Sequence, residues 1–196
     1  AIVTRGETAI SIDSSIFEHN TSYYGSAIDG GLEGNQKKMT INSSEFRYNH
    51  SFEWGGTVTW RGWDGEVAIK NSTFWENIGS GESAGFENSD GLAKITVTNS
   101  TFSGNISNGP GAAFSNRGEE IELHMAYNTF VNNSSWTNEG ALGSLSPMDW
   151  VNSSIENSIF RSNTGGDCDF GSTVNLSIVG NLSDGGPCGT VAATGV

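Results

Sequence analysis

The chain has 196 residues, enough for one domain with a hydrophobic core, and contains 27 Gly but only 3 Pro and 2 Cys. Hydrophobic residues (35%) and charged residues (16%) both fall below their usual shares, which excludes a helical bundle or a coiled coil. The 22 acidic and 9 basic residues give a net charge of −13, which disfavours nucleic acid and anionic membranes as partners.

An internal repeat of about 28 residues runs through the chain, and a repeat of this length is typical of solenoid architectures. Its clearest element is Phe-x-x-Asn, which recurs six times at steps of 29, 28, 28, 28 and 30 residues. The six copies are Phe17 with Asn20, Phe46 with Asn49, Phe74 with Asn77, Phe102 with Asn105, Phe130 with Asn133, and Phe160 with Asn163.

Each unit contains three short apolar segments separated by Gly, Asn and Ser. The first lies five residues before the Phe, at Ile12, Ile41, Ile69, Val97, Met125 and Ile155, and most copies have an apolar residue two positions earlier. This alternation indicates a strand with one face in the core. The Phe marks the second segment, and the third follows small residues at Ile28, Val58, Phe86, Phe114 and Leu142.

One unit cannot bury its own apolar side, but stacked units can. The pattern therefore predicts an all-β, right-handed parallel β-helix of about 7 coils with three short strands each, about 4.8 Å apart, forming one domain over residues 1–196. In this fold the Phe residues form an internal column. We also expect a buried ladder of side-chain amides, because Asn tolerates left-handed turns and both donates and accepts hydrogen bonds: Asn20, Asn49, Asn77, Asn105, Asn133 and Asn163.

The repeat resembles that of secreted and surface right-handed β-helix proteins, including chlamydial polymorphic outer-membrane proteins and surface proteins of the choice-of-anchor type. Their units read approximately N-S-T-F-x-x-N followed by G-G-A-[ILV]. The matching segments are Asn71-Ser72-Thr73-Phe74, Asn99-Ser100-Thr101-Phe102, Gly55-Gly56-Thr57-Val58 and Gly111-Ala112-Ala113-Phe114. The resemblance covers residues 9–190 and implies the fold and an extracellular location. It implies little about activity, because the shared residues belong to the core and the turns.

The two cysteines, Cys168 and Cys188, lie near the C-terminus and lack the C-x-x-C spacing of a zinc or redox site. A disulfide is favoured over two free thiols, and the resemblance also implies that they pair. We expect this disulfide to clamp a final coil over residues 165–190.

A β-helix enzyme acting on polysaccharides would place carboxylates and basic residues on one outer face. The loops after the third apolar segment supply the candidates Asp64, Asp90, Arg61 and Arg117, together with Glu119 and Glu120. No carboxylate recurs at a fixed offset, so a solvated loop edge is favoured over a catalytic site.

Six Trp residues are many for this length, and exposed indoles can stack against sugars. The candidate stacking surfaces are Trp54, Trp60, Trp63 and Trp136. The alternative is that these side chains pack against turns, glycans or another subunit.

Several N-x-[ST] motifs fall at turns or outward positions and are candidates for glycosylation: Asn42, Asn71, Asn99, Asn152, Asn175 and Asn181. No motif indicates a metal site or a cofactor; Ca²⁺ is compatible with the acidic surface but not indicated.

We therefore expect a secreted or surface-displayed structural and adhesive module without a membrane span. Its strand edges point either to adjoining domains of a larger protein or to end-to-end stacking with further copies into a fibre. The alternative is a carbohydrate-active β-helix: an uronate lyase, a hydrolase, or a module that binds surface glycans without turnover.

Overall fold

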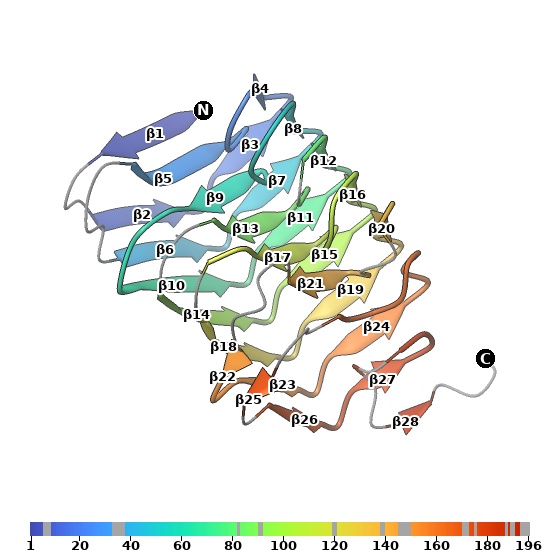
Figure 1. The fold of residues 1–196 in the computed structure, drawn as a ribbon. Coiled ribbons are helices and arrows are strands. Elements are labelled where there is room, and N and C mark those ends of the chain that lie inside the picture. Colours follow the sequence, from blue (N-terminus) through green and yellow to red (C-terminus); the bar gives the residue numbers. More distant parts are fainter. Residues whose placement is uncertain are drawn as a thin grey trace.

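The computed structural model describes residues 1–5, 9–32, 38–81, 83–89, 92–118, 121–137, 140–144, 150–169, 173–174, 176–186, 188 and 191–192. Its regular secondary structure is entirely β. The coils stack in chain order, from the first strands in blue to the last in red (Figure 1), and all strand pairs are parallel, so the chain forms a β-solenoid as the repeat predicts. Among the described residues there is no helix, and hence none that could span a bilayer.

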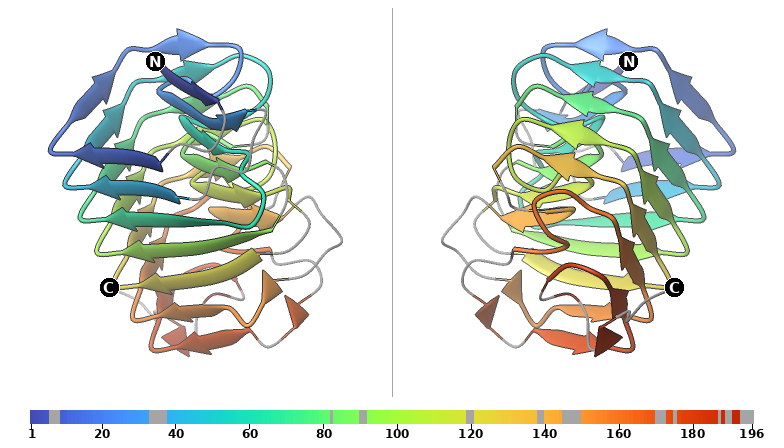
Figure 2. Two further views of the ribbon diagram at one scale, coloured as in Figure 1. Left: turned by 90° about the vertical axis from the view of Figure 1, so that its left-hand side faces the viewer. Right: turned by 90° about the vertical axis from the view of Figure 1, so that its right-hand side faces the viewer.

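Four sheets, named A to D, run along the solenoid, and two views at right angles to Figure 1 show their strands in layers (Figure 2). Sheet A contains β1 (Ile2–Arg5), β5 (Ile28–Leu32), β9 (Val58–Trp60), β13 (Phe86–Asn88), β17 (Phe114–Asn116) and β21 (Leu142–Ser144). Sheet B contains β2 (Ala9–Asp13), β6 (Lys38–Asn42), β10 (Gly65–Lys70), β14 (Ala93–Thr98), β18 (Ile121–Ala126), β22 (Trp150–Val151), β23 (Ser154–Glu156), β25 (Thr173–Val174) and β26 (Ser177–Val179).

Sheets C and D follow sheet B within each coil. Sheet C contains β3 (Ile16–Glu18), β7 (Glu45–Arg47), β11 (Thr73–Trp75), β15 (Thr101–Ser103), β19 (Thr129–Val131), β24 (Ile159–Arg161), β27 (Leu182–Ser183) and β28 (Val191–Ala192). Sheet D contains β4 (Thr21–Ser22), β8 (His50–Ser51), β12 (Ile78–Gly79), β16 (Ile106–Ser107) and β20 (Ser134–Ser135).

The coil count and the strand count per coil both differ from the prediction. Within the described residues, five coils have a strand in all four sheets, rather than about seven coils with three strands each. The missed strands are those of sheet D. Each has two residues, which is too short for an alternating pattern to reveal.

The core is a set of side-chain columns that run along the solenoid axis. Six Phe rings stack with centroid separations of 5.0, 4.6, 4.8, 5.1 and 4.7 Å and interplanar angles of at most 10°, in the order Phe17, Phe46, Phe74, Phe102, Phe130 and Phe160. The separations match the spacing of hydrogen-bonded strands, because equivalent residues pair directly between coils. Phe17, in the first coil, is only partly buried.

The Asn residues of the repeat form a continuous ladder beside this column. From Asn20 to Asn133, each backbone N–H and each Nδ2 donates to the Oδ1 of the Asn in the next coil, and each Nδ2 from Asn49 to Asn163 also donates to the Phe carbonyl of the preceding coil. The four central members, Asn49, Asn77, Asn105 and Asn133, have no exposed surface.

The left-handed backbone conformation belongs to the residue before each ladder Asn, so the expected reason for Asn at these positions is only partly right. Positive φ angles occur at His19, Tyr48, Glu76, Gly104, Asn132 and Ser162. Asn is required for its amide, which supplies two donors and one acceptor to neighbouring coils, and not for its backbone freedom.

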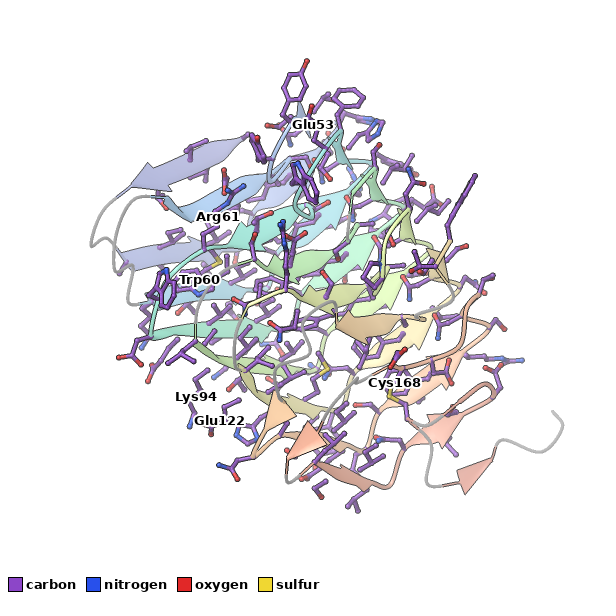
Figure 3. The ribbon with its side chains drawn as sticks, viewed as in Figure 1. Glu53, Trp60, Arg61, Lys94, Glu122 and Cys168 are labelled. Carbon is purple, nitrogen blue, oxygen red and sulfur yellow. A yellow bond between two sulfur atoms is a disulfide. The ribbon has the colours of Figure 1, made fainter. Side chains whose placement is uncertain are left out.

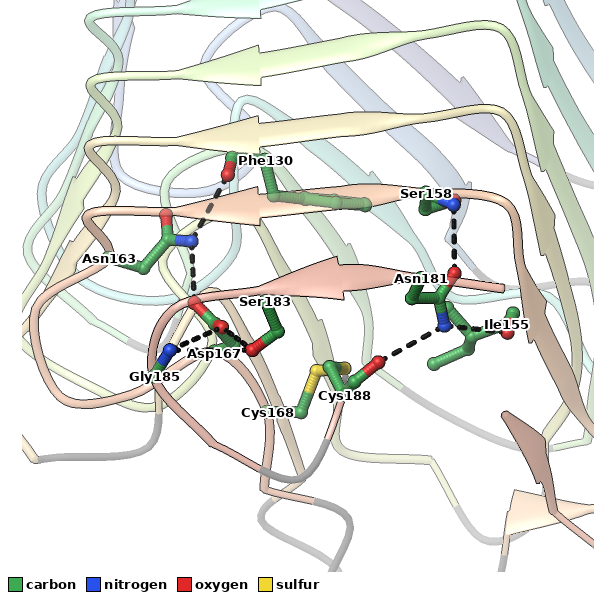
Figure 4. Close-up of a disulfide and its surroundings, with 10 residues drawn as sticks. All are labelled: Phe130, Ile155, Ser158, Asn163, Asp167, Cys168, Asn181, Ser183, Gly185 and Cys188. Atoms are coloured by element: carbon green, nitrogen blue, oxygen red, sulfur yellow. Dashed lines mark hydrogen bonds between the residues drawn. A yellow bond between two sulfur atoms is a disulfide. The ribbon is translucent and has the colours of Figure 1, made fainter. Parts of the chain in front are cut away.

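The last coils end on a disulfide between Cys168 and Cys188, whose Cα atoms lie 5.6 Å apart (Figure 4). Beside it, the ladder ends on a buried carboxylate: Asp167 accepts hydrogen bonds from Asn163 Nδ2 at 2.9 Å, the Gly185 N–H at 3.1 Å and the Ser183 hydroxyl. This carboxylate takes the place of the next Asn as acceptor.

Candidate functional site

The side of sheet A that faces away from the core carries a buried polar column. By strand register, Asp29, Thr59, Glu87 and Ser115 occupy equivalent positions on successive coils, and all four are at most 4% exposed. Side chains alternate along a strand, so these residues lie opposite the apolar column that contains Phe86 and Phe114. An outward face of a solenoid is normally solvated, so something must cover it.

Among the described residues, aromatic and arginine side chains from the ends of the sheet A strands lie beside this column. Tyr24 and Trp54 occupy equivalent positions just before β5 and β9, and Arg61 and Arg117 directly follow β9 and β17. A Cβ atom at Gly55 would overlap the hydroxyl of Thr59, which shows how closely the segment after Trp54 lies over the column.

Each arginine stacks on an aromatic ring. The guanidinium carbon of Arg61 lies 4.9 Å from the centroid of Tyr24, and that of Arg117 lies 4.7 Å from the centroid of Trp54. Arg61 Nε also lies 3.0 Å from Asp29 Oδ1, and this ion pair is largely buried. Stacking and pairing fix the plane of a guanidinium, so its remaining N–H groups point in set directions.

Together these side chains line a hollow of about 270 Å³, formed by Tyr24, Trp54, Arg61, Ser89 and Arg117; we name it the arginine site. Positions 61, 89 and 117 are equivalent on three successive coils, because β9, β13 and β17 pair in register. The small Ser89 therefore lies between the two arginines. Among the described residues its hydroxyl has no hydrogen-bond partner, and the same holds for the buried hydroxyls of Thr59 and Ser115.

The structure separates the residues considered for catalysis. Arg61 and Arg117 belong to the arginine site, whereas Asp64 lines a second hollow of about 360 Å³ on the outer face of sheet B, with no lining residue in common. Figure 3 shows Arg61 well apart from Lys94 and Glu122 of that second hollow. Asp64 has a positive φ and its N–H donates to the Leu92 carbonyl, so it forms the turn into β10. Asp90, Glu119 and Glu120 lie outside the described residues.

Charges of alternating sign run along the outer face of sheet B beside the second hollow. Lys38, Glu66, Lys94 and Glu122 pair in register on successive coils, so the sign of the charge alternates along the solenoid. Lys94 Nζ and His124 Nε2 each lie 2.8 Å from Glu122 Oε1. These hydrogen bonds hold the pKa of Glu122 below its usual range, and Glu122 raises the pKa of Lys94. This face is a surface charge ladder.

The indoles differ in their access to a ligand. The prediction that Trp60 is a stacking surface is wrong, because it is fully buried in the core. Trp54, Trp63 and Trp136 are 44%, 50% and 76% exposed. Of these, Trp54 lines the arginine site, and Arg117 covers one face of its ring.

The glycosylation candidates also differ in whether their side chains are exposed. Asn181 is wrong as a candidate, because it is fully buried and its Nδ2 donates to the carbonyls of Ile155 and Cys188 (Figure 4). Asn71, Asn99 and Asn152 are exposed and Asn42 is half-buried. The amides of Asn42, Asn71 and Asn99 form a second, external ladder. Asn175 lies outside the described residues. Within the described part of the chain, no group of three or more His, Cys, Asp or Glu side chains is placed to hold a metal ion.

Fold and site together define a parallel β-solenoid with a covered polar face and a hollow between two arginines. Comparison of the chain with protein-family models, curated proteins and solved structures found no match.

Two members of the arginine site, Tyr24 and Ser89, were not predicted from the sequence. Tyr24 had a usable signal: an aromatic residue stands directly before glycine in two successive units, at Tyr24-Gly25 and Trp54-Gly55. No sequence signal identified Ser89, because its role depends on being the small residue between Arg61 and Arg117 on the two neighbouring coils.

Proposed function

We propose that the chain is a non-catalytic, extracellular adhesive module that binds surface glycans at the arginine site. The observation that carries this proposal is the hollow itself: two guanidinium groups, each ordered by an aromatic ring, flank an open space with a partly exposed indole at its edge. Aromatic faces and ordered polar groups in one concavity are typical of sugar-binding sites.

The disulfide supports the extracellular part of the proposal. Disulfides persist in oxidising compartments and are rare in the cytosol, and this one closes the last coils. The repeated ladders support a mechanical role, since a spacer or adhesin requires a scaffold in which each coil is bonded to the next. The resemblance to surface β-helix repeat proteins agrees with both roles.

A glycan array with the full chain tests the proposal. We expect binding to a subset of glycans that is lost in Trp54→Ala and kept in Trp136→Ala, which removes a more exposed indole outside the arginine site. Circular dichroism of both variants checks that the β-fold is retained. Binding to no glycan, or equal loss in both variants, would refute the proposal.

A further inference from the structure

We infer that the arginine site recognises the acidic group, a carboxylate or a sulfate, of a single sugar residue, held between Arg61 and Arg117 above Ser89. This inference rests on the proposed glycan binding and specifies the class of sugar. It is carried by the arrangement of donors in the hollow.

The donors converge on one small space. Both guanidinium groups line the hollow, and Ser89, on the coil between them, contributes a hydroxyl without a partner among the described residues. Arg61 uses Nε toward Asp29, which leaves its two terminal nitrogens for a ligand. A planar guanidinium donates most strongly to a carboxylate or sulfate that meets its edge, and stacking against Tyr24 leaves that edge available.

The buried column beneath the hollow explains why the arginines stay there without a ligand. Asp29 forms an ion pair with Arg61, Arg117 is held against the Trp54 ring, and the buried Glu87 occupies the position of Asp29 two coils further along the same column. The same arrangement restricts the ligand. One acidic group can share the outward N–H donors, whereas a dense polyanion would meet the field of a chain whose net charge is −13.

The size of the hollow also favours one sugar residue. Its volume of about 270 Å³ is below the roughly 300 to 1,000 Å³ of pockets that enclose drug-sized ligands. The partly exposed rings of Tyr24 and Trp54 at its edge are placed to contact the carbon–hydrogen face of a sugar ring.

The test compares matched sugars by NMR titration of the full chain. The probes are methyl glucuronide, methyl glucoside 6-sulfate and methyl glucoside, which differ only at the exocyclic position as carboxylate, sulfate ester and neutral hydroxymethyl. We expect one or both acidic sugars to bind at least about tenfold more tightly than the glucoside, with the Trp54 indole signal shifting. The preferred acidic sugar identifies which group is recognised.

Another arginine of the same protein, Arg47, provides the control for substitution of Arg117. Arg117→Gln should remove the preference for acidic sugars, whereas Arg47→Gln should not, although Arg47 also pairs with glutamates and lies 5.9 Å from a Trp75 ring. Ser89→Asp provides a variant that keeps both arginines: its carboxylate would occupy the hollow and abolish binding of acidic sugars without loss of thermal stability.

The outcomes separate this inference from the proposed function. Equal binding of acidic and neutral sugars, lost in Trp54→Ala, would overturn the acidic-group inference while supporting glycan binding. Retention of the acidic preference in both Arg117→Gln and Ser89→Asp would also overturn it. Failure of every sugar on the array and in the titration would overturn both.

Discussion

The Oδ1 atom of Asn105 accepts two hydrogen bonds from Asn77, one coil earlier: the side-chain Nδ2 at 3.0 Å and the backbone N–H at 3.2 Å. The Nδ2 of Asn105 in turn donates to the Phe74 carbonyl at 3.0 Å and to Asn133 at 2.9 Å. A single buried amide therefore connects three coils, and its removal would leave several buried polar groups without partners.

Replacement of this amide should be costly. We expect Asn105→Ala to lower the free energy of unfolding by about 3 kcal/mol, because each unsatisfied buried polar group costs about 1–3 kcal/mol. Asn108→Ala, three residues away on the surface, removes one exposed hydrogen bond to Ser80 and should change stability by less than about 0.5 kcal/mol. Urea denaturation of both variants measures the difference; equal costs would contradict a structural role for the ladder.

The Phe column predicts that removal of a ring costs more stability in the middle of the solenoid than at its end. Phe102 is fully buried between two rings at 4.8 and 5.1 Å, whereas Phe17 has one ring neighbour and is partly buried. Phe102→Ala should cost about 3–5 kcal/mol and Phe17→Ala markedly less, because the end coil exposes the ring before mutation. Calorimetric unfolding of the pair checks this, and a larger cost at Phe17 would argue against the stacked column.

The disulfide should stabilise the last coils. Its cysteines are 20 residues apart, and closing a loop of that length contributes about 3 kcal/mol in the chain-entropy model. Reducing agent should therefore lower the unfolding midpoint of the wild type and leave the C168S/C188S variant unchanged, since the chain has only these two cysteines. Hydrogen exchange should locate the loss around β27, which directly follows Asn181, whose Nδ2 donates to the Cys188 carbonyl; uniform loss over all coils would contradict local clamping.

Glu122 should give the folded state a specific acid sensitivity. Its pKa is lowered in the folded protein by hydrogen bonds from Lys94 and His124, so folding favours the ionised carboxyl. The resulting stabilisation is complete above the ordinary carboxyl pKa of about 4.3 and is lost as pH falls toward the lower folded value. Solvent screening limits it to below about 1 kcal/mol, because these side chains are more than one-third exposed.

E122Q removes this titration. The variant should be less stable than the wild type at neutral pH, and the difference should shrink as pH falls below about 4, when the wild-type carboxyl is also neutral. Denaturant midpoints at several pH values measure the effect. A difference that stays constant with pH would show that Glu122 contributes by packing alone.

The repeat made the fold predictable because a solenoid places residues one period apart directly above one another. Phe74 and Phe102 are 28 residues apart in the sequence and pair directly between β11 and β15. Similar reasoning located the Asn ladder, which needs only the period and the hydrogen-bonding capacity of the amide. It failed for Trp60, whose indole is fully buried in the core, and for Asn181, whose buried amide donates to the Cys188 carbonyl.

The arginine site was only partly predictable. Arg61, Arg117 and Trp54 were recognised as candidates for two different reasons, as charged residues of a loop edge and as an exposed indole. They meet because long side chains extend across coils. Arg117, which follows β17, stacks on Trp54, which precedes β9 and so lies two coils earlier. The conformation of such a side chain depends on its rotamer and its neighbours, and the spacing of residues in the sequence does not predict it.

The sequence by itself determined the parallel solenoid, the stacked rings and the amide ladder, because a period near 28 places the apolar residues and the ladder Asn residues of successive units directly above one another. Only the tertiary structure decided which outward face is covered, which indoles remain exposed and where cations gather. Those outcomes depend on side chains from different coils competing for the same space, and one-dimensional spacing carries no information about that competition.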